Sequence, residues 1–183
     1  QFVDLNTSPF KKDIEAYFED FILKSYVLKL NEKLKAETSK LNSIDTDIKK
    51  NYKEIAKNDK LILKLESEIE NTNRQIENHD SQYNALLTSI EESKTELAKT
   101  SKDNENYKVV KKEVKNLEKN KKTMESDHLN NKELVYDDEA KIVATKDAIS
   151  ALEGSIASLE ERKIAQKQVI LDLEEEIYSL SKP

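Results

Sequence analysis

An apolar column with a period of seven residues constrains the fold of this chain more than any other feature. Every seventh position from residue 27 to residue 97 is apolar, in a stretch without Gly or Pro. The members of this column are Val27, Leu34, Leu41, Ile48, Ile55, Ile62, Ile69, Ile76, Tyr83, Ile90 and Leu97. A sustained period of seven is typical of an α-helix whose narrow apolar seam winds around another helix. The sequence therefore predicts a coiled coil.

The composition agrees with a coiled coil and argues against several other classes. Of the 183 residues, 37% are charged and one is Gly, whereas ordinary globular domains have about 25% charged residues and about 7% Gly. The chain has no Cys, which excludes disulfides, thiolate zinc sites and Cys nucleophiles. No apolar run approaches the roughly 20 residues of a membrane span, and no signal peptide is visible. We therefore expect no membrane span and a cytoplasmic (intracellular) protein.

A second apolar pattern follows in a different register. Residues 99–106 (KTSKDNEN) include no apolar side chain, and beyond them the first column would continue onto polar residues. New apolar columns start instead at Tyr107 and at Val110. A register that breaks inside a polar stretch is explained by a reversal of the chain. The predicted fold is therefore all-α, a long antiparallel two-helix coiled-coil hairpin with its tip near residues 99–106.

The predicted hairpin divides the chain into four segments. They are an N-terminal segment with the start of an aromatic amphipathic helix (1–30), a first coiled-coil arm (31–98), the tip (99–106) and a second arm (107–183). Ser8 fits the N-cap of the first helix, with Pro9 at the first helical position. The only Gly, Gly154, lies within the second arm, where we expect a slight bend or a close approach of the two backbones.

A fold about residue 100 provides a first hypothesis for the pairing of the two arms. Under this pairing, polar residues of one seam face polar residues of the other. The pairs are Lys163 with Glu37, His128 with Thr72, and Lys121 with His79. Buried polar groups cost about 1–3 kcal/mol when they lack a partner, so such matching favours this register.

No part of the sequence indicates a catalytic centre. His79 and His128 are the only histidines, and the predicted register sets them apart on the seam. We interpret them as two tolerated polar residues; the alternative is a pH-sensitive or metal-binding pair. The chain has no glycine-rich phosphate loop, no metal-ligand spacing and no nucleophile elbow. We expect no enzymatic activity, no catalytic or metal-ligating residue and no cofactor.

The first predicted helix begins with an apolar face that is wider than a two-stranded seam requires. Its members are Phe10, Ile14, Tyr17, Phe18, Phe21, Ile22 and Tyr26. Its first residue precedes the reach of the second arm under the predicted pairing. An exposed apolar face of this size usually marks an interface. We therefore expect other proteins to bind to this face. Self-association into a homo-oligomer through the same face is the alternative.

Lysines crowd the segment that follows the predicted tip. They are Lys108, Lys111, Lys112, Lys115, Lys119 and Lys122, together with Lys121. Only Glu113 and Glu118 oppose them in this segment. The patch suits an acidic protein, a phospholipid surface or a nucleic acid, or it is a plain solvated face. The net charge of -6 and the single aromatic residue in this segment, Tyr107, argue against nucleic acid.

The residues at the turn resemble a segment of a bacterial family. The run of residues 103–114 reads DNENYKVVKKEV, and in it Asn104, Tyr107, Lys112, Glu113 and Val114 fit the pattern of that family, whereas Asn106 stands where Glu is usual. The family has a long antiparallel coiled-coil hairpin followed by a C-terminal zinc ribbon. The resemblance implies a cytoplasmic adaptor or a chaperone-like protein. This chain has no Cys, so the ribbon is either absent or has been cut away, and the resemblance does not extend to a zinc-dependent role.

These observations together favour a non-enzymatic structural or interaction protein, a rigid coiled-coil hairpin that serves as an adaptor or spacer in a protein assembly. The alternative is a coiled-coil arm of a larger machine, such as a chromosome-maintenance ATPase or a kinetochore-type rod, with a parallel dimer as one form of it.

Overall fold

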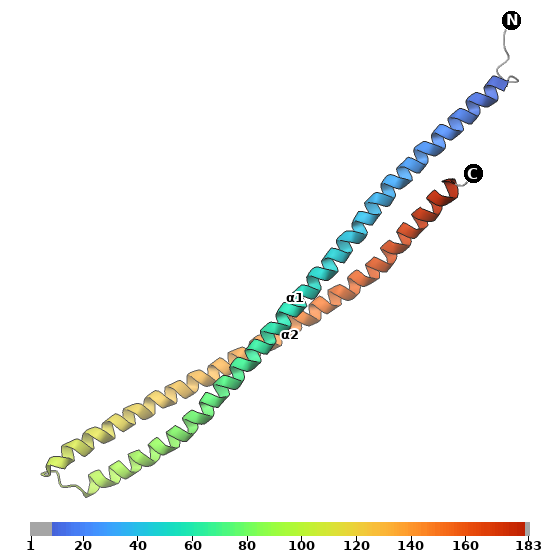
Figure 1. The fold of residues 1–183 in the computed structure, drawn as a ribbon. Coiled ribbons are helices and arrows are strands. Elements are labelled where there is room, and N and C mark those ends of the chain that lie inside the picture. The colour runs from blue at the N-terminus through green and yellow to red at the C-terminus, as the bar shows by residue number, and fades with distance from the viewer. Residues whose placement is uncertain (1–8, 182–183) are drawn as a thin grey trace. The chain divides into compact units, whose positions relative to one another are not determined.

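The computed structural model describes residues 9–181, with side chains from residue 11 onward, and consists of two long helices (Figure 1). α1 runs from Pro9 to Lys99, and α2 runs from Glu105 to Ser181. The described residues form no strand. The predicted all-α two-helix hairpin is thereby confirmed, and a straight rod in a parallel dimer is not the fold of this chain. Neither of the described helices has a stretch apolar and long enough to cross a membrane.

The predicted apolar columns form the buried seam of the helix pair. From residue 27 to residue 97, every member of the first column is buried or half-buried. The members of the columns that start at Tyr107 and Val110 are also buried or half-buried. Seven of the ten most buried apolar residues lie on these columns: Ile48, Ile90, Val110, Val114, Ile156, Ile170 and Leu173. The other three, Leu30, Ile44 and Leu65, lie on a second column of α1, three residues after the first. The period of seven in the sequence is therefore the period of the core.

The link between α1 and α2 lies within the predicted tip. The Asn104 N–H donates to the Ser101 carbonyl at 3.0 Å, which closes a tight turn. The Asn104 side chain then caps α2, because its Oδ1 accepts a hydrogen bond from the Asn106 N–H at 3.0 Å. Asn is among the best N-cap residues because it satisfies a backbone donor that the helix leaves free. α2 consequently starts at Glu105, slightly before the predicted start at Tyr107.

The helix pair divides into two compact units, and each is described by itself. Unit 1 comprises Gln1–Ile55 and Ala151–Pro183, and unit 2 comprises Ala56–Ser150. In the described part of unit 1, the beginning of α1 lies antiparallel to the end of α2. In unit 2, the rest of α1 returns through the turn into the first part of α2.

The predicted pairing of polar residues across the seam is wrong by about one heptad. In unit 1, Lys163 pairs with Asp45, with 2.7 Å between Nζ and Oδ1, rather than with Glu37. In unit 2, His128 lies beside Asp80, at 3.7 Å from Nδ1 to Oδ1, and not opposite Thr72.

The repeat itself explains this error in register. Sliding one helix along the other by seven residues returns the same columns to the same layers, so the columns alone do not fix the partners. The turn fixes them instead, and the link that Asn104 closes lies after residue 100.

Gly154 lies inside a regular part of α2 in unit 1. Its φ is not positive, and no described atom would come within 4 Å of a Cβ built at this position. The expected close approach of two backbones is therefore wrong, and the position has room for a side chain.

Candidate functional site

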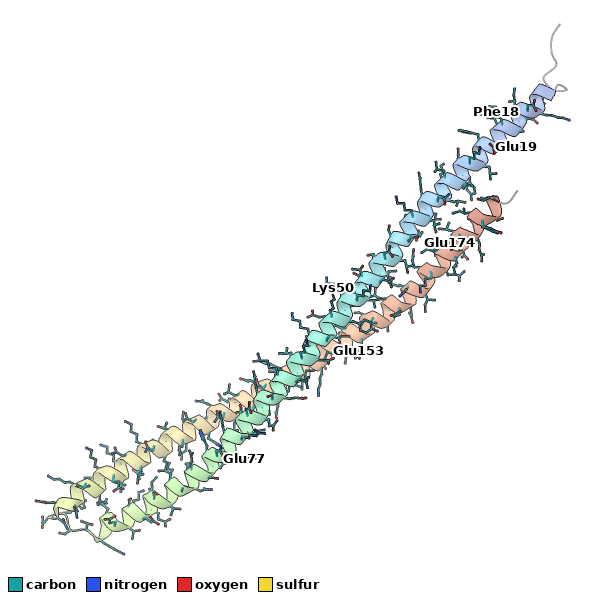
Figure 2. The ribbon with its side chains drawn as sticks, viewed as in Figure 1. Phe18, Glu19, Lys50, Glu77, Glu153 and Glu174 are labelled. Carbon is teal, nitrogen blue, oxygen red and sulfur yellow. The ribbon has the colours of Figure 1, made fainter. Side chains whose placement is uncertain are left out.

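In unit 1, α1 extends past the end of α2. Near the end of the paired region, the Tyr26 hydroxyl donates to the Glu176 carboxylate at 2.7 Å. This hydrogen bond raises the pKa of Tyr26 because it favours the protonated phenol beside a negative carboxylate. Figure 2 shows Phe18 and Glu19 on the stretch of α1 that continues beyond the end of α2. We call the described part of α1 before Tyr26 the overhang.

The overhang holds most of the residues predicted for partner binding, and their side chains are exposed. The exposed fractions are 36% for Ile14, 69% for Tyr17, 57% for Phe18, 58% for Phe21, 65% for Ile22 and 46% for Tyr26. The side chain of Phe10 lies outside the described residues. The structure thus brings the other members together on one stretch of helix, where none of them belongs to the core of the hairpin.

Apart from Tyr26, which reaches Glu176 on α2, these apolar side chains occupy the side of α1 that is opposite to the seam. A helix turns by about 100° per residue, which places Ile14, Phe18 and Phe21 in a narrow arc with Tyr17 and Ile22 at its edges. The seam residues that follow them on α1 point the other way. We call the set Ile14, Tyr17, Phe18, Phe21, Ile22 and Leu28 the back face.

Leu28 shows that α2 does not cover the back face. It lies one heptad after Phe21, within the stretch of α1 that pairs with α2. Even there its side chain is 62% exposed, whereas Leu30 on the seam is 7% exposed. A longer α2 would therefore extend the seam and still leave the back face open.

A further exposed column runs along α2 and is not among the residues predicted for binding. In unit 1 it consists of Ile164, Leu171 and Tyr178, each at least half exposed. In unit 2 the same spacing of seven holds Leu129, Tyr136 and Val143, all exposed. In the sequence this column is recognisable by its period of seven. The seam columns of α2 have the same period and fewer interruptions, so they are more conspicuous. These residues offer apolar surface on the outside of each unit.

The predicted basic patch lies in unit 2 on the first turns of α2. The six lysines Lys108, Lys111, Lys112, Lys115, Lys119 and Lys122 are all exposed. Glu118 pairs across the seam with Lys94, with 2.8 Å between Oε1 and Nζ, and this contact lowers the pKa of Glu118. Lys121 differs from the six, because it is half-buried on the seam and lies 3.9 Å from Glu125.

The two histidines, expected to lie apart, line one small cavity in unit 2. The cavity has a volume of about 220 Å³ and is lined by His79, Asp80, Tyr83, Met124, Glu125 and His128. The Nδ1 atoms of both histidines are buried and have no hydrogen-bond partner among the described residues. The prediction that the seam separates these histidines is wrong because it depended on the earlier register.

Two of the polar groups of this cavity pair with each other. Tyr83 donates its hydroxyl proton to Glu125 at 2.7 Å, and this hydrogen bond raises the pKa of Tyr83. Among residues 9–181, no group of three or more His, Cys, Asp or Glu side chains is placed to hold a metal ion. The cavity is therefore a polar interruption of an apolar seam.

In unit 1, the carboxylates of Glu37 and Asp45 have partners on α2. The Gln166 amide donates to the Glu37 backbone carbonyl at 2.8 Å and also to the Glu37 carboxylate. The hydrogen bond from Gln166, with a further one from Lys40, lowers the pKa of Glu37. The Lys163 ammonium likewise lowers the pKa of Asp45. Each of these carboxylates is stabilised in its charged form.

Comparisons of this chain with models of known protein families, with curated proteins and with solved structures find no match.

Proposed function

We propose that this protein is a non-enzymatic interaction protein, a coiled-coil hairpin that acts as an adaptor or spacer and binds its partner through the back face. The observation that carries the proposal is the exposure of the back face on the side of α1 opposite to the seam. Large contiguous apolar patches are rare on monomeric proteins and usually mark binding sites.

The seam supports a holding role rather than a chemical one. Its layers join two helices, and the buried side chains that the structure describes there are apolar. General acid–base catalysis needs titratable groups that converge on a bound substrate. The back face, which stays exposed after the hairpin has formed, is apolar and helical, which suits packing against another helix.

The alternative, an arm of a larger machine, is favoured by one observation. The described start of α1 and the described end of α2 belong to the same unit. A hairpin arm that leaves a larger body at one place requires this arrangement. In that alternative the back face would contact the body from which the arm extends.

A photo-crosslinking experiment tests the proposed docking surface. A photoreactive phenylalanine analogue replaces Tyr17 on the back face or, as a matched control in the same unit, Tyr52, which is 54% exposed on α1. We expect irradiation in cells to yield a discrete crosslinked species from position 17, at several times the yield from position 52. Equal yields at the two positions, or no product at either, would contradict docking through the back face.

A further inference from the structure

We infer that the occupant of the back face is a second copy of this chain, with the two overhangs packed antiparallel, back face against back face. The inference rests on the proposed docking function and specifies its partner. It is argued from the apolar area, the direction of the back face and the order of the charges along the overhang.

The exposed area matches what a stable dimer needs. Aromatic side chains each bring about 150–250 Å² to an interface. With the exposed fractions given above, the five residues of the back face that lie on the overhang offer roughly 650 Å² per copy. Specific interfaces bury about 600–1,000 Å² per partner. The overhang therefore offers enough apolar area for an interface at the lower end of this range.

The direction of the back face leaves room for a second copy. Since the back face lies opposite to the seam, another α1 helix packs along it without displacing α2. The pairing between α1 and α2 begins near Tyr26 and Glu176. In an antiparallel dimer centred on Phe18, the hairpins of the two copies would leave the joint at opposite ends of the overhang.

The order of charges along the overhang favours the antiparallel orientation. Asp13 and Lys24 lie on the same flank of the back face, about equally far before and after Phe18. Antiparallel packing centred on Phe18 brings Asp13 of one copy beside Lys24 of the other, twice by symmetry. Parallel packing about a two-fold axis would place Asp13 and Lys24 of the two copies on opposite flanks of the joint, where they would not pair. Within one copy, Lys24 contacts Asp20 at 3.0 Å and remains 78% exposed, so it is available to a second carboxylate.

Sedimentation equilibrium of the full chain tests the dimer. We expect the native chain to be dimeric at micromolar concentration, and Phe18→Ser with Phe21→Ser to weaken dimerisation about 100-fold or more, as loss of two central aromatic residues does. The matched control is Leu129→Ser with Tyr136→Ser, two exposed apolar residues of unit 2, which should leave the dimer unchanged. Circular dichroism confirms that each variant remains helical.

A charge swap tests the orientation. Lys24→Asp alone should weaken dimerisation about three- to tenfold, since it sets two carboxylates against each other in each of two symmetric places. Adding Asp13→Lys should restore the native affinity. If the double variant is no tighter than the single one, the antiparallel arrangement is wrong.

Because the chain has no Cys, a single introduced thiol reports directly on the contact. Phe18→Cys places one thiol per copy near the symmetry axis, and mild oxidation should link two copies covalently. Tyr136→Cys, equally accessible on unit 2, should not form this link at the same concentration.

The failures of the two proposals are distinguishable. In one outcome, the native chain stays monomeric up to about 100 μM while position 17 crosslinks to a different polypeptide. This result would overturn the proposal that a second copy is the occupant and would retain the docking surface. A monomeric chain with no crosslink at position 17 would overturn both.

Discussion

Single polar side chains on the seam determine where the helix pair is held well and where it is weak. Gln166 satisfies both the backbone carbonyl and the carboxylate of Glu37, whereas the buried Nδ1 atoms of His79 and His128 have no hydrogen-bond partner among the described residues. A buried polar group without a partner costs about 1–3 kcal/mol. The histidine cavity is therefore a layer of unit 2 that we expect to destabilise the hairpin.

Replacing these histidines with apolar residues should stabilise the hairpin. We expect His79→Leu with His128→Ile to raise the free energy of unfolding at neutral pH by about 1–3 kcal/mol, because the change removes unsatisfied polar atoms and fills an open layer. Urea denaturation followed by circular dichroism measures the difference. The control, His79→Gln, keeps a polar group in the layer and should bring little gain; an equal gain would show that hydrogen bonding at this layer does not matter.

Gly154 provides a second test at the scale of one residue. Gly154→Ala should raise the free energy of unfolding by about 0.5–1 kcal/mol, because Ala has the higher helix propensity and the structure leaves room for its Cβ. Thermal unfolding monitored at 222 nm compares the two chains. A loss of stability would mean that the backbone at this position needs the freedom of Gly.

At the scale of the element, the sequence predicts the helices and their buried faces well. A period of seven with no Gly or Pro from residue 27 to residue 97 leaves little choice of structure, and the described burial follows the predicted columns. The register was not predictable in the same way, since a slip of one heptad preserves every column. The polar residues do not resolve this ambiguity, because a residue such as Lys163 finds a carboxylate in either register, Glu37 in the one predicted and Asp45 in the one observed.

The candidate sites were predicted unevenly for the same reason. The back face was visible because Tyr17, Phe18 and Phe21 exceed what one seam can bury. Whether His79 and His128 line the same cavity depends on the register of the two helices. The register predicted from the sequence placed the two histidines apart. The exposed column through Tyr136 has a clear period but is interrupted by small residues, and it was missed.

A charge swap should verify the register of unit 1. Lys163→Asp should lower the midpoint of thermal unfolding, because it places two carboxylates together where an ion pair of 2.7 Å now stands. Adding Asp45→Lys should recover most of the loss. Adding Glu37→Lys, which serves as the control for the register first predicted, should not. If Glu37→Lys, and not Asp45→Lys, recovers the stability lost in Lys163→Asp, the helices pair in the register first predicted, one heptad away.

The carboxylates of the helix pair should make the hairpin sensitive to acid. Gln166 and Lys40 lower the pKa of Glu37, and Lys163 lowers the pKa of Asp45. A lowered pKa in the folded state means that the stabilisation is present above the ordinary values of 4.5 for Glu and 3.8 for Asp, and is lost as the pH falls through the lowered pKa.

Thermal unfolding followed between about pH 6 and pH 3 measures this effect. We expect the midpoint to fall towards the acid end. In the variant Glu37→Gln with Asp45→Asn the fall should be shallower, because groups that do not titrate cannot lose their charge. A native midpoint that does not change over this range would show that these contacts contribute nothing to folding.

At the scale of the whole molecule, the seam of the hairpin is only two columns wide on each helix. Nearly all the contacts that stabilise it therefore lie between facing turns of α1 and α2. Each layer contacts chiefly the layers before and after it, as in other quasi-linear folds. Neither unit has a wide core, so the free energy of the pair is spread along its length. Surfaces outside the seam, the back face above all, remain available for binding.

The common location of the described helix ends in unit 1 has a mechanical consequence. A load applied between Pro9 and Ser181 acts across the seam and not along it, so the helices would peel apart turn by turn from those ends towards Asn104. We expect such a geometry to yield gradually, one turn after another, rather than in a single step.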